Sequence, residues 1–216
     1  MHLDIWSPGH VMLHHKDGGH VLNCMCDLTQ FIVSCLLTDT KADALSRIFM
    51  EQVVLNFGMV AIVVVDADSR FRSTFEAMCK TLKLTFWPLS RGNHKGNSVE
   101  RYHRFLNKTQ TICGQDRGTH EVFHQNVKTS QYAWNSAPID DTDIPRCVAA
   151  VGREFRFPLD IELLEKPTLN ASDNSALFHY LRNVSGNSKF AVSVLQTLLE
   201  ERRLSHKEQW NKDRTL

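Results

Sequence analysis

The sequence lacks several features that would place the protein in a specialised class. Its 216 residues contain no run of the roughly 18 to 20 apolar residues that a membrane-spanning helix needs. Its first residues lack the charged start and apolar core of a signal peptide. No internal repeat is visible, which excludes a solenoid or propeller. We therefore expect a soluble protein inside the cell.

An excess of charge of either sign is also absent. The chain has 25 basic and 24 acidic residues, which leave a formal net charge of +1. A uniformly basic surface for nucleic acid is thereby excluded, so any contact with DNA has to come from local clustering. A hydrophobic content of 42% is enough for one sizeable core with an appendage.

Cysteine pairs with the two-residue spacing of common zinc knuckles are missing too. The six cysteines lie mostly inside apolar runs, where cysteine behaves as a small buried hydrophobe, so we expect a reducing compartment. Cys24 and Cys26 share one face of a predicted strand, which favours the core over a zinc site. This leaves four nearby histidines without an assigned metal: His10, His14, His15 and His20.

The pattern of apolar residues predicts an α/β fold with a mixed five-stranded sheet. The predicted strands cover residues 2–6, 21–26, 31–37, 59–65 and 84–87. The unbroken apolar run at 59–65 is typical of a strand buried on both faces. The predicted helices cover residues 41–57, 73–82, 98–111 and 119–134, followed by one or two amphipathic helices within 176–184 and 190–204. Residues 38–40 are expected to cap the first helix, and Gly58 to end it.

Three carboxylates occupy informative positions in this order of elements. Asp4 lies on the first strand, Asp66 directly follows the apolar strand, and Glu100 lies in the first turn of a helix after the polar segment 90–97. Carboxylate oxygens are the ligands that Mg²⁺ and Mn²⁺ prefer. An acidic group that closes an apolar strand is costly unless it is solvated, paired or metal-bound. The alternative is that Asp66 or Asp68 caps the helix that follows.

The residues around these carboxylates resemble the catalytic core of retroviral and long-terminal-repeat retrotransposon integrases. The family motif His-x-Asp-x-Trp-x-Pro is similar to residues 2–8. Its second motif, a hydrophobic strand followed by Asp and, five residues later, Phe, is similar to residues 65–71. Its third motif, a polar glycine-containing loop before Val-Glu-Arg and an aromatic-rich helix, is similar to residues 93–108. Residues 132–139 and 152–158 look like the end of that core, so the resemblance covers residues 1 to about 158.

The resemblance implies a ribonuclease-H-like fold and a metal-dependent polynucleotidyl transferase. Two Mg²⁺ or Mn²⁺ ions would lie between the carboxylates, with Asp4 on both ions and Asp66 and Glu100 on one each. The implied reactions are 3′-end processing and strand transfer of retrotransposon DNA. The implied partners are double-stranded DNA and further copies of the chain, and the implied location is the nucleus. The domains would be a core over residues 1–158 and a linker with a helical tail over 159–216.

Candidate DNA contacts surround Glu100. Arg104, Asn107 and Lys108 follow it on one face of the same predicted helix, and Val99 and Leu106 recur on another face that we expect to be core. The loop before Glu100 adds three further candidates: Arg91, His94 and Lys95. The alternative for the helix is an ordinary solvated face.

The chain also departs from the family pattern. Ala67 and Asp68 stand where the family usually has Asn or Arg and then Gly, so Asp68 is an alternative ligand to Asp66. The sequence starts three residues before Asp4, which implies an N-terminally truncated core without the upstream zinc-binding module. Two other functions stay open: a ribonuclease-H-like nuclease that uses only water, and a decayed or domesticated copy that binds DNA or partners without catalysis.

Overall fold

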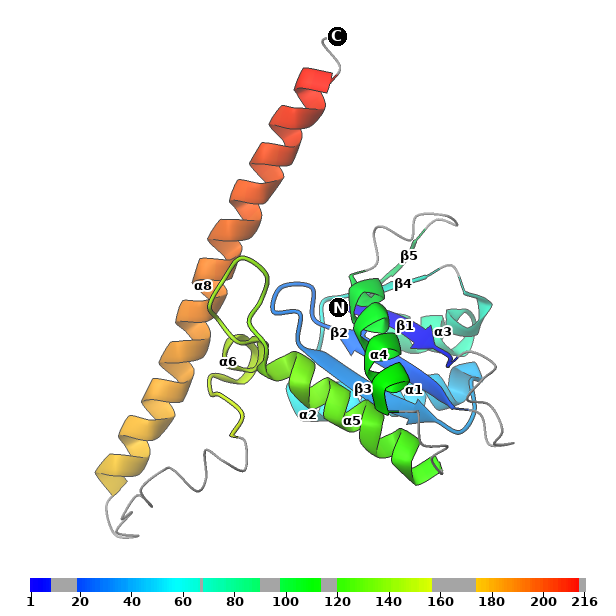
Figure 1. Ribbon diagram of the computed structural model, residues 1–216. Helices are drawn as coiled ribbons and strands as arrows, with labels where there is room; N and C mark the ends of the chain where they lie inside the picture. The colour runs from blue at the N-terminus through cyan, green and yellow to red at the C-terminus, as the bar shows by residue number, and fades with distance from the viewer. Residues whose placement is uncertain (9–18, 67, 90–97, 114–119, 157–173, 214–216) are drawn as a thin grey trace. The chain divides into compact units, whose positions relative to one another are not determined.

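A computed structural model of the chain describes residues 1–8, 19–66, 68–89, 98–113, 120–156 and 174–213 (Figure 1). The backbone divides into two compact units, Met1–Trp134 and Asn135–Leu216. The predicted domain boundary at residue 158 lies outside the described residues.

One mixed sheet of five strands organises the first unit (Figure 1). Its strands are β1 (His2–Trp6), β2 (His20–Met25), β3 (Ile32–Leu37), β4 (Ile62–Val65) and β5 (Thr85–Pro88). Their order across the sheet is β3-β2-β1-β4-β5. β1, β2 and β3 pair antiparallel, whereas β4 runs parallel to both β1 and β5. The predicted α/β architecture, a mixed five-stranded sheet flanked by helices, is confirmed.

The prediction that the fourth strand is buried on both faces is wrong. Val63 and Val65 are buried, but Ile62 is 44% exposed. Successive side chains of a strand point to opposite faces. The face of Val63 packs under α3 (Thr74–Thr81), since Phe86, which is opposite Val63, contacts Phe75 of that helix. The other face of β4 is covered less completely.

The single helix predicted over 41–57 is divided in the structure. It consists of α1 (Ala42–Phe49), a π-helical stretch (Met50–Val54) and α2 (Leu55–Phe57), and it ends at Gly58 with a φ of 89°. The predicted cap is wrong. Lys41 occupies the capping position without a side-chain hydrogen bond, and a lysine side chain has no acceptor to offer. Asp39 accepts the backbone N–H of Lys41 in a local turn before the helix.

The remaining helices follow the predicted order. They are α3, α4 (Val99–Cys113), α5 (His120–Ser136), α6 (Arg146–Val151) and α8 (Asn174–Asp213). The two predicted tail segments form one continuous helix, α8. The short α6 was not predicted. Among the helices of the described ranges, none combines the length and the apolar character needed to cross a membrane.

Apolar side chains are buried on both faces of the sheet. On one face the aromatic rings of Phe49, Phe71 and Phe75 pack edge to face under α1 and α3. On the other face α4 and α5 bury Tyr102, Leu106, Val127 and Trp134 against β2 and β3. The expectation that Val99 and Leu106 belong to the core is confirmed, because both are fully buried.

Side chains of α5 cover the backbone of β3, which is an edge strand. The Ser34 N–H donates to Gln131 Oε1 at 2.9 Å, and Lys128 Nζ donates to the Ser34 carbonyl at 2.6 Å. Trp134 Nε1 donates to the carbonyl of Gln30 just before the strand, at 3.0 Å. Unpaired N–H and C=O groups on an edge strand invite pairing with another chain. Here helix side chains satisfy part of that edge.

The second unit is built on the packing of α6 against α8. Ser188 Oγ donates to the carbonyl of Ala149 at 3.2 Å, and Ala191 and Leu195 of α8 are buried. Gly152 ends α6 in the left-handed conformation, with a φ of 78°. A Cβ at this position would overlap the backbone carbonyl of Val184, so only glycine permits the close approach of the two helices.

We therefore predict that Gly152→Ala destabilises the protein by about 1 to 3 kcal/mol, because it combines left-handed strain with backbone overlap. Urea denaturation followed by circular dichroism measures the change. Gly186→Ala is the matched control, since a Cβ there meets nothing within 4 Å and alanine favours the helix. Equal stability of the two variants would contradict the packing described.

Candidate functional site

Asp4 and Asp66 lie next to each other at the junction of two parallel strands. The register of β1 and β4 pairs His2 with Val64 and Leu3 with Val65. The next pair in this register is Asp4 and Asp66, the latter one residue past the end of β4. The structure therefore brings two of the three predicted carboxylates together across 62 positions of sequence.

Burial and neighbouring charge both act on Asp4. Burial raises the pKa of the Asp4 carboxyl to about 6, and the negative charges of Asp66 and Asp68 add to the rise. A hydrogen bond from the Ile5 N–H to Asp4 Oδ1, at 2.8 Å, and the charge of Arg70 oppose it. A partly buried carboxylate beside other carboxylates is a place where a cation would be favourable.

His103 of α4 contacts Asp4 from the side of the helix. Its Nδ1 lies 3.7 Å from Asp4 Oδ2, and its side chain is 14% exposed. Burial lowers the pKa of His103 to about 4, so the ring is neutral at neutral pH and the contact is polar rather than ionic. Sequence reasoning missed this residue, although its place one helical turn after Glu100 was a usable signal.

Glu100 lies in the first turn of α4, where its side chain is exposed. It shares a helix face with His103, which contacts Asp4, but the structure does not place its carboxylate with the two aspartates. In the part of the chain that the structure describes, no three His, Cys, Asp or Glu side chains lie close enough together to hold a metal. The structure thus assembles two of the predicted ligands and leaves the third one turn away along α4.

Asp68 is engaged with Arg70. The Asp68 carboxylate accepts the backbone N–H of Arg70 at 2.9 Å and its guanidinium Nε at 2.8 Å. Although burial favours the neutral form, these bonds hold the pKa of Asp68 below its ordinary value. Asp68 caps the short 3-10 helix Ser69–Phe71, which was not predicted, whereas the predicted helix that follows, α3, has Ser73 at its capping position. As a substitute ligand it would first have to leave Arg70.

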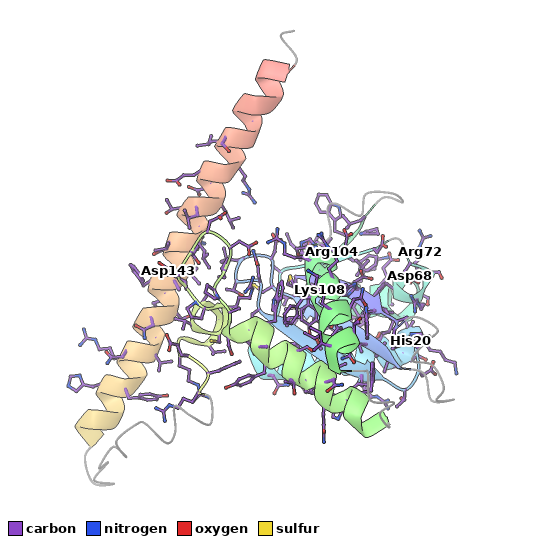
Figure 2. The ribbon with its side chains drawn as sticks, viewed as in Figure 1. His20, Asp68, Arg72, Arg104, Lys108 and Asp143 are labelled. Atoms are coloured by element: carbon purple, nitrogen blue, oxygen red, sulfur yellow. The ribbon has the colours of Figure 1, made fainter. Side chains whose placement is uncertain are left out.

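The predicted DNA contacts on α4 differ in their surroundings. Arg104 and Lys108 are exposed one turn apart on the helix (Figure 2). Asn107 Oδ1 accepts a hydrogen bond from Trp6 Nε1 at 2.9 Å, which ties α4 to β1. The oxygen of the Asn107 amide is therefore engaged within the fold. The candidates Arg91, His94 and Lys95 lie outside the described residues.

The histidines and cysteines weighed for zinc do not share one environment. Cys24 is fully buried in β2, as expected, but Cys26 follows the strand and is only partly buried. His20 Nδ1 is within 2.6 Å of Ser7 Oγ. The other three histidines of that group lie outside the described residues.

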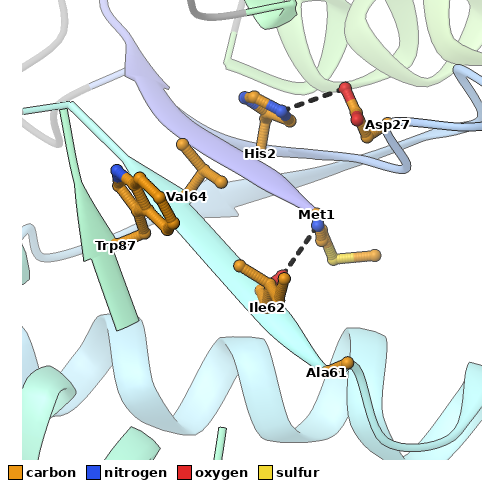
Figure 3. Close-up of a pocket in the computed structure, with 7 residues that line it drawn as sticks. All are labelled: Met1, His2, Asp27, Ala61, Ile62, Val64 and Trp87. Atoms are coloured by element: carbon orange, nitrogen blue, oxygen red, sulfur yellow. Dashed lines mark hydrogen bonds and ion pairs between the residues drawn. The ribbon is translucent and has the colours of Figure 1, made fainter. Parts of the chain in front are cut away.

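A pocket of about 410 Å³ opens on the sheet face that carries Asp4 (Figure 3). His2, Val64 and Trp87 form one row across β1, β4 and β5, directly before the row of Asp4 and Asp66. His2 Nε2 contacts Asp27 at 3.1 Å, and Trp87 is 59% exposed. The pocket is lined by none of the three predicted carboxylates.

Comparisons with known proteins do not identify the chain. No protein-family model matches it, and no curated protein sequence matches it. Function therefore has to be inferred from the residues and their geometry.

The electrostatics of Asp4 lead to a prediction about pH. A carboxyl whose pKa rises from 3.8 in the unfolded chain to about 6 in the folded one binds its proton more tightly when folded. Its contribution to stability is therefore present below about pH 4 and is lost as the pH rises through about 6. Asp4→Asn should raise the free energy of unfolding at about pH 7 by on the order of 2 kcal/mol, and should change it little at about pH 4.

Urea denaturation at the two pH values measures this difference. The exposed Glu51→Gln is the control and should change stability equally little at both. If Asp4→Asn raised the free energy of unfolding as much at the lower pH as at the higher one, burial of the Asp4 charge would not be the cause of the increase.

Proposed function

We propose that the chain is the catalytic core of an integrase of the retroviral and retrotransposon type, which cuts and joins DNA with divalent metal ions. The observation that carries this proposal is the meeting of Asp4 and Asp66 on neighbouring parallel strands, with His103 of α4 in contact with Asp4. The motifs around all three residues support it. Processing of the 3′ end and strand transfer would be the two reactions of this site.

The sheet supports the ribonuclease-H-like fold that the resemblance implies. Three antiparallel strands are followed by two parallel ones, in the order β3-β2-β1-β4-β5, with helices on both faces. In this topology the first and fourth strands are neighbours. That adjacency is what a site made of Asp4 and Asp66 requires.

The side chains present fit a pair of Mg²⁺ or Mn²⁺ ions in their chemistry. Burial raises the pKa of Asp4, and the negative charges of Asp66 and Asp68 add to the rise, so a hard cation beside these carboxylates would be favourable. Asp4 and Asp66 would hold the ions, with Glu100 as the third ligand that the resemblance implies. When bound, such ions lower the pKa of the attacking water or hydroxyl and stabilise the leaving oxygen.

The exposed cations of α4 would form a DNA-binding surface. Arg104 and Lys108 follow Glu100 at intervals of four residues, so all three lie along one helix face. Phosphates held by the two cations would place a DNA backbone beside the carboxylates. The proposed partners are double-stranded DNA and further copies of the chain, and the proposed site of action is the nucleus.

One observation favours a second candidate, a non-catalytic copy that binds DNA or partners. Glu100 is exposed and is not gathered with the two aspartates. A chain that had lost catalysis would no longer need that convergence. The two candidates differ in whether removal of the Glu100 charge changes any reaction.

We predict that Glu100→Gln lowers strand transfer with Mn²⁺ by on the order of a hundredfold or more, because it removes one metal-binding charge and keeps the shape. The assay uses a labelled donor duplex and measures both trimmed and joined products. Glu51→Gln removes an exposed carboxylate from the π-helical stretch after α1. It is the matched control and should retain the native signal.

The two kinds of product separate the alternatives. Trimming without joining would indicate a nuclease that uses only water. Equal signals from the native chain and Glu100→Gln, or no product from either, would overturn the catalytic proposal in favour of the non-catalytic copy.

A further prediction concerns DNA affinity. The double variant Arg104→Gln/Lys108→Gln should weaken binding to a duplex at all sequences and reduce the slope of log K against log salt by about 2. Fluorescence anisotropy over a salt series measures both effects. Lys80→Gln/Lys83→Gln, which removes two exposed cations at α3, should leave the slope unchanged. An unchanged slope in the α4 variant would remove this helix face from the DNA interface.

A further inference from the structure

A row of polar side chains crosses the sheet beside Asp4. Asp4 of β1 is directly opposite Asn23 of β2, and Asn23 is directly opposite Ser34 of β3. Directly opposite residues share a face of the sheet and have Cβ atoms roughly 4.5 to 5.5 Å apart. Asn23 and Ser34 are both fully buried. Asn23 is therefore the buried neighbour of Asp4 on β2.

Hydrogen bonds fix which way the Asn23 amide faces. Ser34 Oγ donates to Asn23 Oδ1 at 2.7 Å, and Tyr102 Oη of α4 lies 3.0 Å from the same hydroxyl. Hydrogen bonds with side chains of α5 hold the backbone of Ser34. The amide oxygen thus points toward β3. The amide nitrogen is directed away from Ser34, and β1 lies on that other side of β2.

The two residues that flank Asp4 on β2 and α4 each carry a buried polar atom without a hydrogen-bond partner. Within the described residues, neither Asn23 Nδ2 nor His103 Nε2 has a hydrogen-bond partner. Buried polar groups nearly always have one, because leaving them unsatisfied is costly. An amide N–H is a donor, and the carboxylate of Asp4 is the acceptor nearest in register.

We infer that Asn23 is a positioning residue for Asp4: its Nδ2 faces the Asp4 carboxylate, and it donates to that carboxylate when Asp4 binds a divalent ion, which holds the carboxylate in its ligating orientation. This inference rests on the proposed metal site. The Ile5 N–H fixes Oδ1 from the backbone side, and Asn23 would fix the carboxylate from within the sheet. Partners of this kind are worth about 10- to 100-fold in metal affinity.

The first experiment needs no metal. In the side-chain amide spectrum of the ¹⁵N-labelled full chain, Asp4→Asn should shift the NH₂ signals of Asn23. The NH₂ signals of Gln110 are an internal control, because this amide is also buried and unsatisfied but lies two turns beyond His103 on α4. They should not move. Unmoved Asn23 signals would overturn the inference.

The second experiment measures Mn²⁺ affinity by calorimetry on the full chain. Asn23→Leu keeps the volume and removes the amide, and it should weaken Mn²⁺ binding about 10- to 100-fold. Gln110→Leu makes the same change elsewhere in the buried layer and should bind as tightly as the native chain. Thermal unfolding of both variants confirms that they are folded.

The outcomes separate the inference from the function on which it rests. Native affinity in Asn23→Leu would overturn the role of Asn23 and leave the metal site standing. A native chain that does not bind Mn²⁺, or binds it equally well as Asp4→Asn, would overturn the proposed function. The amide spectrum then still decides whether Asn23 faces Asp4.

Discussion

The parallel pairing of β1 with β4 is the constraint on which the rest of the structure depends. β1 lies at the centre of the sheet, antiparallel to β2 and parallel to β4. A parallel partner requires a crossover connection, which the segment of α1, the π-helical stretch and α2 supplies. Because β1 and β4 run in the same direction, Asp4 and Asp66 come to the same place. An antiparallel β4 would carry Asp66 to the opposite end of the sheet.

The register of β1 is fixed by polar as well as apolar contacts. Leu3 and Ile5 face one layer of helices, whereas Asp4 and Trp6 face α4, where they meet His103 and Asn107. A slip of one residue would exchange these sets between the two faces. It would bury Asp4 among the rings under α1 and α3 and leave Asn107 and His103 against leucine and isoleucine. The polar layer therefore specifies the pairing that builds the site.

Much of the fold could be predicted because strands and helices have different periods, and each long element carries its own period. The adjacency of Asp4 and Asp66 depends on the order of the strands across the sheet, which the pattern of apolar residues did not give. The π-helical stretch, the exposed Ile62 and the short α6 could not be predicted, because they depend on which neighbours cover them. His103 and Asn23 were missed as well. The significance of Asn23 comes from strand register, which local sequence does not give, whereas the spacing of His103 from Glu100 on one helix was a usable signal.

The cover of β3 by α5 has a consequence for biosynthesis. Ser34 obtains its backbone partner Gln131 from a position 97 residues later in the chain. At a translation rate of about 5 to 20 residues per second, the strand emerges from the ribosome several seconds before the helix that shields it. During that interval the apolar β3 presents an open edge in a crowded cell. The edge of β3 is therefore completed only after the second half of the first unit has been made.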